Sequence, residues 1–455
     1  MAEIKPFRIW CPRADVVGRV AASPYDTFSR AEATVEIARE PLSFLRIDKP
    51  AALVGEEVGE YDLKVYTRAL EELEAWYEQR IMVPVSEPLE PAFLIYRLSK
   101  DGRVQTGILA LASAADYQNG TIKRHENTRP EKEQDRIDHI QVLRVHSSPV
   151  LMTYPSQPEL DAFLRGFVVA RQTLFDFETS DGVRHEVWQA GDADSVAYLQ
   201  EAFASIATLY IADGHHRAAA AAHVAELEGT EGLVGCTSDG SGDCESAEPG
   251  VQKSKESRDC ESVDSVDCLN TESAYQKSDE SQFFLVALFG SDELRVFDYN
   301  RIVSDLAGLE PAELLASIST VMDVVQQGPE PYRPIKRGEY GMYLDGSWYQ
   351  LTLHEALRPK DAVDGLDVAV LHDSVLEPFL GIENPRTSPR IAYVGGSRGL
   401  EELARRAHET GGVAFALYPC SLAELFAVAD EDRLMPPKST WFEFKPRSGL
   451  AIHRI

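Results

Sequence analysis

The chain has 455 residues, enough for two or three domains with a sizeable hydrophobic core. Hydrophobic residues make up 44% of it and aromatic residues 9%, which is the composition of a globular protein. The 74 acidic and 45 basic residues give a formal charge of −29. This charge argues against a general binder of nucleic acid or anionic membranes, because polyanions would be repelled except at a local basic site.

Membrane spans and a disulfide framework are not expected either. No stretch approaches the roughly 18 uninterrupted apolar residues that a membrane span requires, and the opening residues lack the apolar core of a secretory signal, so we expect a cytoplasmic protein. Four of the six cysteines lie in one polar segment, which argues against disulfides that run through the core. The cysteines are Cys11, Cys236, Cys244, Cys260, Cys268 and Cys420.

The first half of the chain mixes helix and strand patterns. Apolar residues at helical spacing predict a helix over 65–80, and two apolar runs around Lys100-Asp101-Gly102-Arg103 predict a hairpin over 93–98 and 106–111. A short apolar strand over 208–212 leads into an alanine-rich helix that we place from about Arg217.

Residues 229–282 interrupt this pattern with 13 acids, 4 bases and scattered apolar residues, and we interpret them as a disordered acidic insertion. Their four cysteines follow C-x7-C-x15-C-x7-C, whereas zinc sites favour C-x2–4-C. A metal site and a local duplication of Asp-Cys-Glu-Ser (243–246 and 259–262) both remain open, and the duplication is the simpler explanation.

After the insertion the pattern again predicts both element types, with strands over 283–289 and 294–297. A second α/β lobe is predicted from 331, with a hairpin through Asp345-Gly346 and a helix over 368–376 that Pro378 ends. Strands over 391–394 and 413–417 and helices over 400–410 and 422–429 complete it. The expected fold is therefore mixed α/β (α+β), with residues 1–228 and 283–330 forming one region and 331–455 the second lobe.

The densest chemical signal is Asp213-Gly214-His215-His216-Arg217, between the strand and the alanine-rich helix. Backbone N–H groups at a helix start are unpaired and lie at the positive end of the helix dipole, so a phosphate can bind there. Gly214 would permit a close approach, and Arg217 would supply a planar fork of donors. The alternative is a turn in which Asp213 caps the helix and the histidines are structural.

A second signal spans residues 123–136, where charged side chains recur at helical spacing. Thr128 can cap a helix whose first turn holds Pro130, and a solvated charged helix is the alternative explanation. Acids, bases and histidine at its start suit a site for a nucleotide, a divalent metal and a hydroxyl. The candidates are His125, Glu126, Arg129, Lys132 and Arg136.

Three lesser candidates are Ser23-Pro24-Tyr25-Asp26, Tyr299-Asn300-Arg301 and Pro436-Pro437-Lys438-Ser439-Thr440. The Lys-Ser-Thr triplet lacks the preceding glycines of a P-loop. The motifs of dinucleotide oxidoreductases, α/β-hydrolases and zincins are also missing from the sequence.

These motifs together resemble the DUF1015 family, whose members are often labelled SpoOJ/ParB-like. The resemblance rests on Ser23–Asp26, Ser43-Phe44-Leu45-Arg46, His125–Arg129, Ala212–Arg217, Tyr299–Arg301 and Met435–Thr440. The Asp213–Arg217 turn also resembles the phosphate-binding turn of the wider ParB/sulfiredoxin superfamily, which includes kinases of free serine. That resemblance implies a ParB/sulfiredoxin-like core that holds nucleotide phosphates on the helix after Gly214. His215 stands where sulfiredoxin has its reactive cysteine, so sulfinic acid repair is not expected.

The resemblance and the candidate residues together predict a nucleotide-dependent kinase of a small hydroxylated metabolite, with free L-serine as the first acceptor to test and ATP or ADP with Mg²⁺ as cofactors. Arg217, Arg129 and the backbone after Gly214 would hold phosphates. Asp213 or Glu126 would act as base or metal ligand, and His215 and His216 would contact the transferring oxygens. The alternatives are a nucleotide-gated binding protein without phosphate transfer and a structural protein without a ligand. No nucleic-acid or membrane partner is expected, and the sequence leaves the oligomeric state open.

Overall fold

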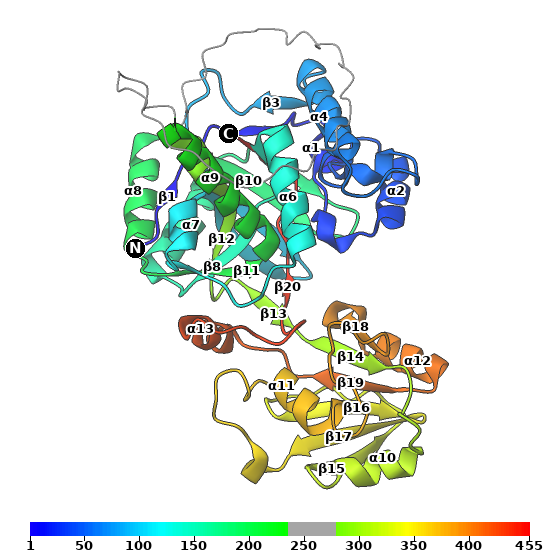
Figure 1. Ribbon diagram of the computed structural model, residues 1–455. Helices are drawn as coiled ribbons and strands as arrows, with labels where there is room; N and C mark the ends of the chain where they lie inside the picture. The colour runs from blue at the N-terminus through cyan, green and yellow to red at the C-terminus, as the bar shows by residue number, and fades with distance from the viewer. Residues whose placement is uncertain (235–278) are drawn as a thin grey trace, which may run out of the picture.

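The computed structural model describes residues 1–234 and 279–455 of the chain. Each of two lobes is built around one large β-sheet with helices packed against it, as Figure 1 shows. The predicted mixed α/β fold class is therefore confirmed. Within the described residues, every helix is too short or too polar to span a bilayer.

The first lobe contains a nine-stranded mixed sheet. Its strand order is β6-β11-β8-β12-β5-β4-β10-β9, with β1 beside β5, and the pairs β6–β11 and β8–β12 are parallel. The strands are β1 (Ile4–Lys5), β4 (Phe93–Lys100), β5 (Arg103–Ser113), β6 (Ile122–Lys123), β8 (Val150–Tyr154), β9 (Phe175–Glu178), β10 (Arg184–Ala190), β11 (Leu209–Asp213) and β12 (Phe283–Gly290).

Both faces of this sheet are covered, which explains why its central strands are apolar throughout. Successive side chains of a strand point to opposite faces, so Phe284 and Val286 of β12 enter one core while Phe283 and Leu285 enter the other. The helices of the first lobe are α1 (Val17–Val20), α2 (Arg30–Arg39), α3 (Leu45–Asp48), α4 (Leu63–Glu78), α5 (Ala114–Gln118), α6 (Pro130–Leu143), α7 (Pro158–Ala170), α8 (Ala193–Ala204) and α9 (His215–Val234). Helices α6 and α9 lie side by side over the sheet in Figure 1.

The second lobe contains a six-stranded sheet in the order β15-β17-β16-β19-β14-β18. Its strands are β14 (Tyr299–Val303), β15 (Met322–Gly328), β16 (Glu339–Leu344), β17 (Ser347–Leu353), β18 (Ile391–Gly395) and β19 (Val413–Leu417). Its helices are α10 (Pro311–Ile318), α11 (Asp367–Leu371), α12 (Leu400–Thr410) and α13 (Leu422–Asp430), and a π-helical turn (His372–Leu376) follows α11.

Three two-stranded ladders complete the fold, and two of them bring the end of the chain back to the first lobe. They are β2 (Trp10–Pro12) with β3 (Met82–Pro84), β13 (Arg295–Phe297) with β20 (Trp441–Glu443), and β7 (Val145–His146) with β21 (His453–Arg454). The sequence analysis assigned 283–330 to the first region and 331–455 to the second. The sheets divide the chain differently. Strands β14 and β15, which precede residue 331, belong to the second sheet, and β21 near the end of the chain pairs with β7 of the first lobe.

Several predicted elements are confirmed. The hairpin forms as β4 and β5, with Asp101 and Gly102 at positive φ in its two-residue turn, and the strand over 413–417 and the helix over 400–410 have the predicted bounds. The helix predicted over 368–376 is split into α11 and the π-helical turn.

Three predicted boundaries are wrong. Helix α9 begins at His215 rather than near Arg217, because Gly214 with φ +98 ends the turn earlier. Arg129, not Thr128, precedes the first residue of α6, since the Thr128 hydroxyl is hydrogen-bonded to Glu133 instead. The acidic insertion was placed at 229–282, but α9 continues to Val234 and a 3-10 turn covers Asp279–Gln282. The rest of that segment, with Cys236, Cys244, Cys260 and Cys268, lies outside the described residues.

Candidate active site at the start of helix α9

In the turn between β11 and α9, the guanidinium of Arg217 lies against the backbone of Gly214. Gly214 joins the two elements with φ +98, a conformation that favours glycine. A Cβ atom at position 214 would lie 2.8 Å from the guanidinium carbon of Arg217, so a side chain there would collide with that group. Glycine is therefore required here both by the backbone conformation and by the position of Arg217.

Asp213, the last residue of β11, is an ionised carboxylate held between two cations. Its Oδ2 accepts from Nη2 of Arg217 at 3.0 Å, and its Oδ1 accepts from Nζ of Lys445 at 2.9 Å. Burial alone would raise the pKa of Asp213, but Lys445 and Arg217 hold it well below its ordinary value. Asp213 is consequently a poor proton acceptor at neutral pH.

Arg217 uses its fork of donors inside the protein. It is buried, and its Nη1 donates to the Ser148 hydroxyl at 3.3 Å and to the Pro149 carbonyl. Its Nε has no hydrogen-bond partner among the described residues. The predicted contact between Arg217 and a phosphate stays a prediction, because in this structure the guanidinium ties Asp213 to the 148–149 loop.

The two histidines of the turn join α9 to the segment before α6. Nε2 of His216 accepts from the Arg129 N–H at 2.9 Å, and Nε2 of His215 accepts from the His125 N–H at 3.5 Å. The His215 ring also meets the His125 ring edge-on, with centroids 4.5 Å apart. Burial lowers the pKa of both His215 and His216, which suits neutral acceptors. Both side chains therefore hold the two predicted motifs together.

His125 lies at the centre of this junction. It is 1% exposed, and burial lowers its pKa to about 4. Neither ring nitrogen makes a hydrogen bond of normal geometry to a described residue. The backbone of His125 is fixed as well, since its carbonyl accepts from the Met435 N–H at 2.8 Å and so ties the junction to the segment 435–440.

Glu126 is the second carboxylate of the site. Its surroundings raise its pKa, whereas those of Asp213 lower the pKa of that group. Its Oε2 lies 4.0 Å from Nδ1 of His215, and its side chain is 38% exposed. Desolvation and the Asp213 charge raise the pKa of Glu126, while Lys438 opposes the rise. Two neighbouring carboxylates thus have pKa values that are shifted apart, a common feature of acid–base sites.

Basic side chains surround these carboxylates. Arg129, Lys132 and Lys438 lie close enough to His216 or Glu126 to affect their pKa values, as does Lys445. Asp26, on the loop before α2, acts on Lys445, Arg217 and His216. We call this set of residues the Asp213 cluster: Asp26, His125, Glu126, Arg129, Lys132, Asp213, Gly214, His215, His216, Arg217, Lys438 and Lys445. It is a local cationic site in a protein whose formal charge is −29.

The predicted nucleotide site also includes Arg136, whose contacts in the structure are with Asp135, Tyr25 and Asp48. Arg136 is buried, its Nε donates to Asp135 at 2.8 Å, and its guanidinium carbon lies 4.1 Å from the Tyr25 ring centroid. Its Nη1 also donates to the Asp48 carbonyl, at the wall of a cavity of about 30 Å³. These contacts pack α6 against the N-terminal segment. Arg217 lines the same cavity, so a role of Arg136 at the nucleotide site stays a prediction.

Lys445 is the member of the cluster that sequence reasoning missed. It follows β20, 232 residues after Asp213, and the β13–β20 pairing together with the hydrogen bonds between Phe444 and Gln105 of β5 places its segment on the first lobe. Asp26 and Lys438 belong to motifs that the sequence analysis considered as lesser candidates. A signal for Lys445 exists in hindsight, since Lys445 and Arg447 form a short basic segment in an acidic chain.

Of the two predicted Mg²⁺ ligands, Asp213 and Glu126, Asp213 does not fit the site, and Glu126 stays a prediction. Both carboxylate oxygens of Asp213 are paired with cations, so a metal ion would have to displace Lys445 or Arg217. Among residues 1–234 and 279–455, the only three-residue group with metal-ligand spacing is His372, Asp373 and Glu377, in the second lobe. Two of its three members are exposed.

Comparison with protein families agrees with the motifs of the sequence. The chain matches the model described as "protein of unknown function (DUF1015)" over residues 4–239 and 260–369, which is more than half of its length. The protein belongs to the DUF1015 family. The match to this family includes Asp213 and Glu126 but ends before Lys438 and Lys445. No curated protein matches the DUF1015 chain in sequence.

Several solved structures align with most of this DUF1015 protein at low similarity. A free serine kinase in complex with AMP is 10% identical, with 73% of this chain and 86% of that chain covered and a TM-score of 0.30. SbnI with a C-terminal truncation from Staphylococcus aureus is 10% identical, with 75% and 85% covered and a TM-score of 0.32. A conserved hypothetical protein from Pyrococcus furiosus is 9% identical, with 74% and 93% covered and a TM-score of 0.30. TM-scores of this size do not define a shared site.

Proposed function

We propose that the Asp213 cluster transfers a phosphoryl group from ATP or ADP to the hydroxyl of a small metabolite. One observation carries this proposal. The carboxylates of Asp213 and Glu126 have opposite pKa shifts and lie among basic side chains, next to the first turn of α9. Phosphoryl transfer needs positive charge for the phosphates and a group that accepts the hydroxyl proton, and it needs little other covalent help from the protein.

The phosphates would lie between the start of α9 and the surrounding lysines. The first N–H groups of a helix have no partner within the helix and attract anions, and α9 begins directly after Gly214. Lys438 and Lys445 belong to the C-terminal segment and act on Glu126, while Arg129 and Lys132 lie at the start of α6. Burial and the neighbouring Arg129 lower the pKa of Lys132, so an incoming phosphate would relieve the repulsion among these cations.

Glu126 is the base in this proposal. The sequence leaves Asp213 and Glu126 as alternative bases, but a carboxylate held ionised by two cations accepts a proton poorly, which favours Glu126. As the acceptor oxygen bonds to the terminal phosphorus, its proton passes to Glu126. The bond between that phosphorus and the bridging oxygen breaks, and the shortened nucleotide leaves with the electron pair. His215 and His216 position this site by fixing the 125–129 segment to α9.

The first experiment is to incubate the protein with ATP or ADP and a panel of hydroxyl metabolites, with L-serine as the first member, in the presence and absence of magnesium. Mass spectrometry of the small-molecule products should show one phosphorylated metabolite. If nucleotide binds but no product forms across the panel, the protein is a nucleotide-gated binding protein and the kinase proposal is wrong.

The Glu126→Gln variant tests the assigned base. We expect kcat to fall by about 100-fold with an unchanged nucleotide Kd, because removal of a positioned base affects the chemical step. Glu71→Gln is the matched control, since Glu71 is an exposed glutamate that pairs with Arg68 on α4. Parental turnover in Glu126→Gln would exclude Glu126 as the base.

A further inference from the structure

A second cavity opens between the N-terminal helices and the turn that joins β9 to β10. Its volume is about 350 Å³, roughly the space of a dozen water molecules and within the usual range of small-molecule pockets. Ser23, Arg39, Glu36, Thr179, Asp181 and Arg447 contribute to its wall. The described residues that line it are all distinct from the Asp213 cluster.

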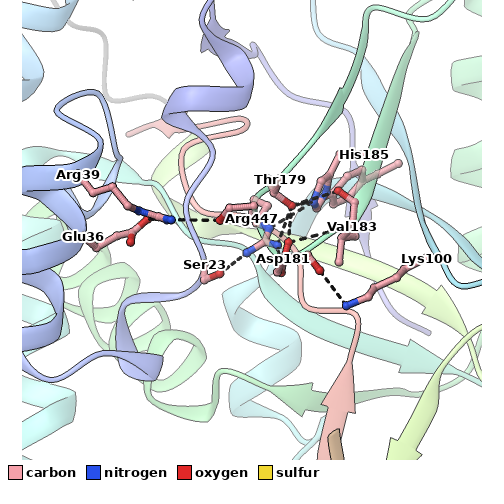
Figure 2. Close-up of polar contacts among 11 residues, drawn as sticks. Ser23, Glu36, Arg39, Lys100, Thr179, Asp181, Val183, His185 and Arg447 are labelled. Atoms are coloured by element: carbon pink, nitrogen blue, oxygen red, sulfur yellow. Dashed lines mark hydrogen bonds and ion pairs between the residues drawn. The ribbon is translucent and has the colours of Figure 1, made fainter. Parts of the chain in front are cut away.

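Arg447 is a buried charge that is held in place from several sides, as Figure 2 shows. Its Nη2 donates to the Thr179 hydroxyl at 3.0 Å and to the Asp181 carboxylate. Its Nη1 donates to the Ser23 hydroxyl, which links the loop before α2 to the chain's C-terminal segment. The wall of the cavity is therefore rigid at this point, because three separate segments meet on one guanidinium.

The neutral side chain of His185 also holds Arg447 in place. Nε of Arg447 donates to Nε2 of His185 at 3.3 Å, so this ring nitrogen is an acceptor and Nδ1 carries the proton. The Tyr96 hydroxyl lies 2.6 Å from that Nδ1 and completes the chain of contacts. Burial and the Arg447 charge lower the pKa of His185 to about 3, which keeps this arrangement at physiological pH.

The charges of the cavity wall cancel in pairs. Three arginines and three acids line it, and each arginine is bound to one of those acids: Arg19 to Glu40 at 2.9 Å, Arg39 to Glu36 at 2.6 Å, and Arg447 to Asp181. The charged side chains that an anion or a cation could bind in this cavity are already paired with a side chain of opposite charge. A neutral group that both donates and accepts can bond to the guanidinium and the carboxylate of one pair without separating them.

The other polar groups of the wall are of the same kind. Four residues with hydroxyl side chains, Ser23, Ser43, Thr179 and Ser180, line the cavity, and the Ser23 and Thr179 hydroxyls bond to Arg447. Phe28 adds one aromatic side chain. Arg39 also reaches the Ser180 hydroxyl at 3.4 Å, so α2 and the β9–β10 turn are in contact at the rim. This wall matches a ligand with several hydroxyl groups on a compact apolar skeleton, because each hydroxyl can both donate and accept.

We propose that this cavity binds a neutral polyhydroxylated molecule, a polyol or monosaccharide. The proposal goes beyond the proposed function, because it concerns a separate set of residues and requires neither a nucleotide nor phosphate transfer.

The test is isothermal titration calorimetry of the full chain without nucleotide. The neutral probes are myo-inositol, D-glucose and D-ribose, and the comparison probes are succinate and cyclohexanol. We expect saturable binding of at least one neutral polyol and binding of every comparison probe that is at least about tenfold weaker, which corresponds to the loss of one hydrogen bond to a charged group. No saturable binding of any polyol at millimolar concentrations, or equally tight binding of succinate or cyclohexanol, would overturn the proposal.

Two variants of α2 locate the site. Arg39 and Glu36 are on the rim, where the side chain of Arg39 is 59% exposed, so both glutamine variants should fold. Arg39→Gln should weaken polyol binding about tenfold. Glu36→Gln leaves Arg39 uncompensated and should increase the affinity for succinate above that of the parent. Arg405→Gln is the matched control, since Arg405 pairs with Glu402 at the same i,i+3 spacing on α12 of the other lobe. Polyol affinity that is unchanged in Arg39→Gln, or reduced equally in Arg405→Gln, would place binding elsewhere.

Discussion

At the scale of single residues, the geometry of the Asp213 cluster depends on a few close contacts around Asp213. Gly214 provides the space in which Arg217 folds back, and Arg217 and Lys445 together fix both oxygens of Asp213. Glu126 is the one carboxylate of the cluster with a raised pKa and a partly exposed side chain. These properties support the proposed role of Glu126 as the base, while Asp213 pairs with two cations.

Gly214→Ala should destabilise the protein by about 2–4 kcal/mol. Part of this cost is the positive φ, about 1–2 kcal/mol, and the rest is the collision of a Cβ with the Arg217 guanidinium. The free energy of unfolding in urea measures it. Gly102→Ala is the matched control, because Gly102 has φ +75 but no described atom lies within 4 Å of the place its Cβ would take, and it should show the conformational cost alone. Equal losses in both variants would mean that Arg217 moves away at no cost.

At the scale of elements, the site depends on the junction of α6 with α9. His215 and His216 accept backbone N–H groups from the segment that leads into α6, and the two helices pack along one face of the first sheet. The loop before α2 is a third element that meets both candidate sites, since Asp26 acts on the Asp213 cluster and Ser23 bonds to Arg447. The position of α2 therefore bears on both.

Helix α2 begins with a capping box that can be tested on its own. Ser29 accepts from the Glu32 N–H at 3.3 Å, and Glu32 accepts from the Ser29 N–H at 2.8 Å. Ser29→Ala should lower the free energy of unfolding by about 1 kcal/mol, because one helix N–H loses its partner. Ser317→Ala, where the hydroxyl bonds to the Glu313 carbonyl within α10, should be nearly neutral. A loss in Ser317→Ala as large as that in Ser29→Ala would show that the cap has no special role.

At the scale of the whole molecule, buried neutral histidines dominate the expected response to acid. Six histidines of the described residues are buried, and burial lowers the pKa of each, to about 4 for three of them and about 3 for one. They are His125, His139, His146, His185, His215 and His453. Each favours the folded state while it is neutral, so its contribution is complete above the unfolded pKa of about 6.5 and falls as pH decreases.

We therefore expect stability to decrease steeply between about pH 6.5 and about pH 4. In this range the unfolded chain binds protons that the folded chain does not, and each histidine contributes up to about 1.4 kcal/mol per pH unit. Urea midpoints at several pH values measure the slope. His453→Gln keeps a donor for the Glu280 carbonyl but removes one titrating group, so its slope should be shallower by up to one proton. A midpoint that stays constant from about pH 7 to about pH 5 would contradict this account.

Local sequence patterns determined much of the secondary structure. The alternation of apolar residues, the Asp101-Gly102 turn and the helical spacing before Thr410 depend on neighbours within a few residues, and the elements they predict are present. The two motifs at 125–129 and 213–217 were identified for the same reason, because each is a short cluster of charged and polar residues at the start of a helix.

Only the tertiary structure decided which groups meet and what each one does. Lys445 reaches Asp213 across 232 residues beside the β13–β20 pairing, and its charge helps to hold Asp213 ionised, which argues against Asp213 as the base. The return of residues 441–455 to the first lobe also places Arg447 in the second cavity. Distances between groups far apart in the chain, and the burial that shifts their pKa values, arise from packing, and no local pattern encodes them.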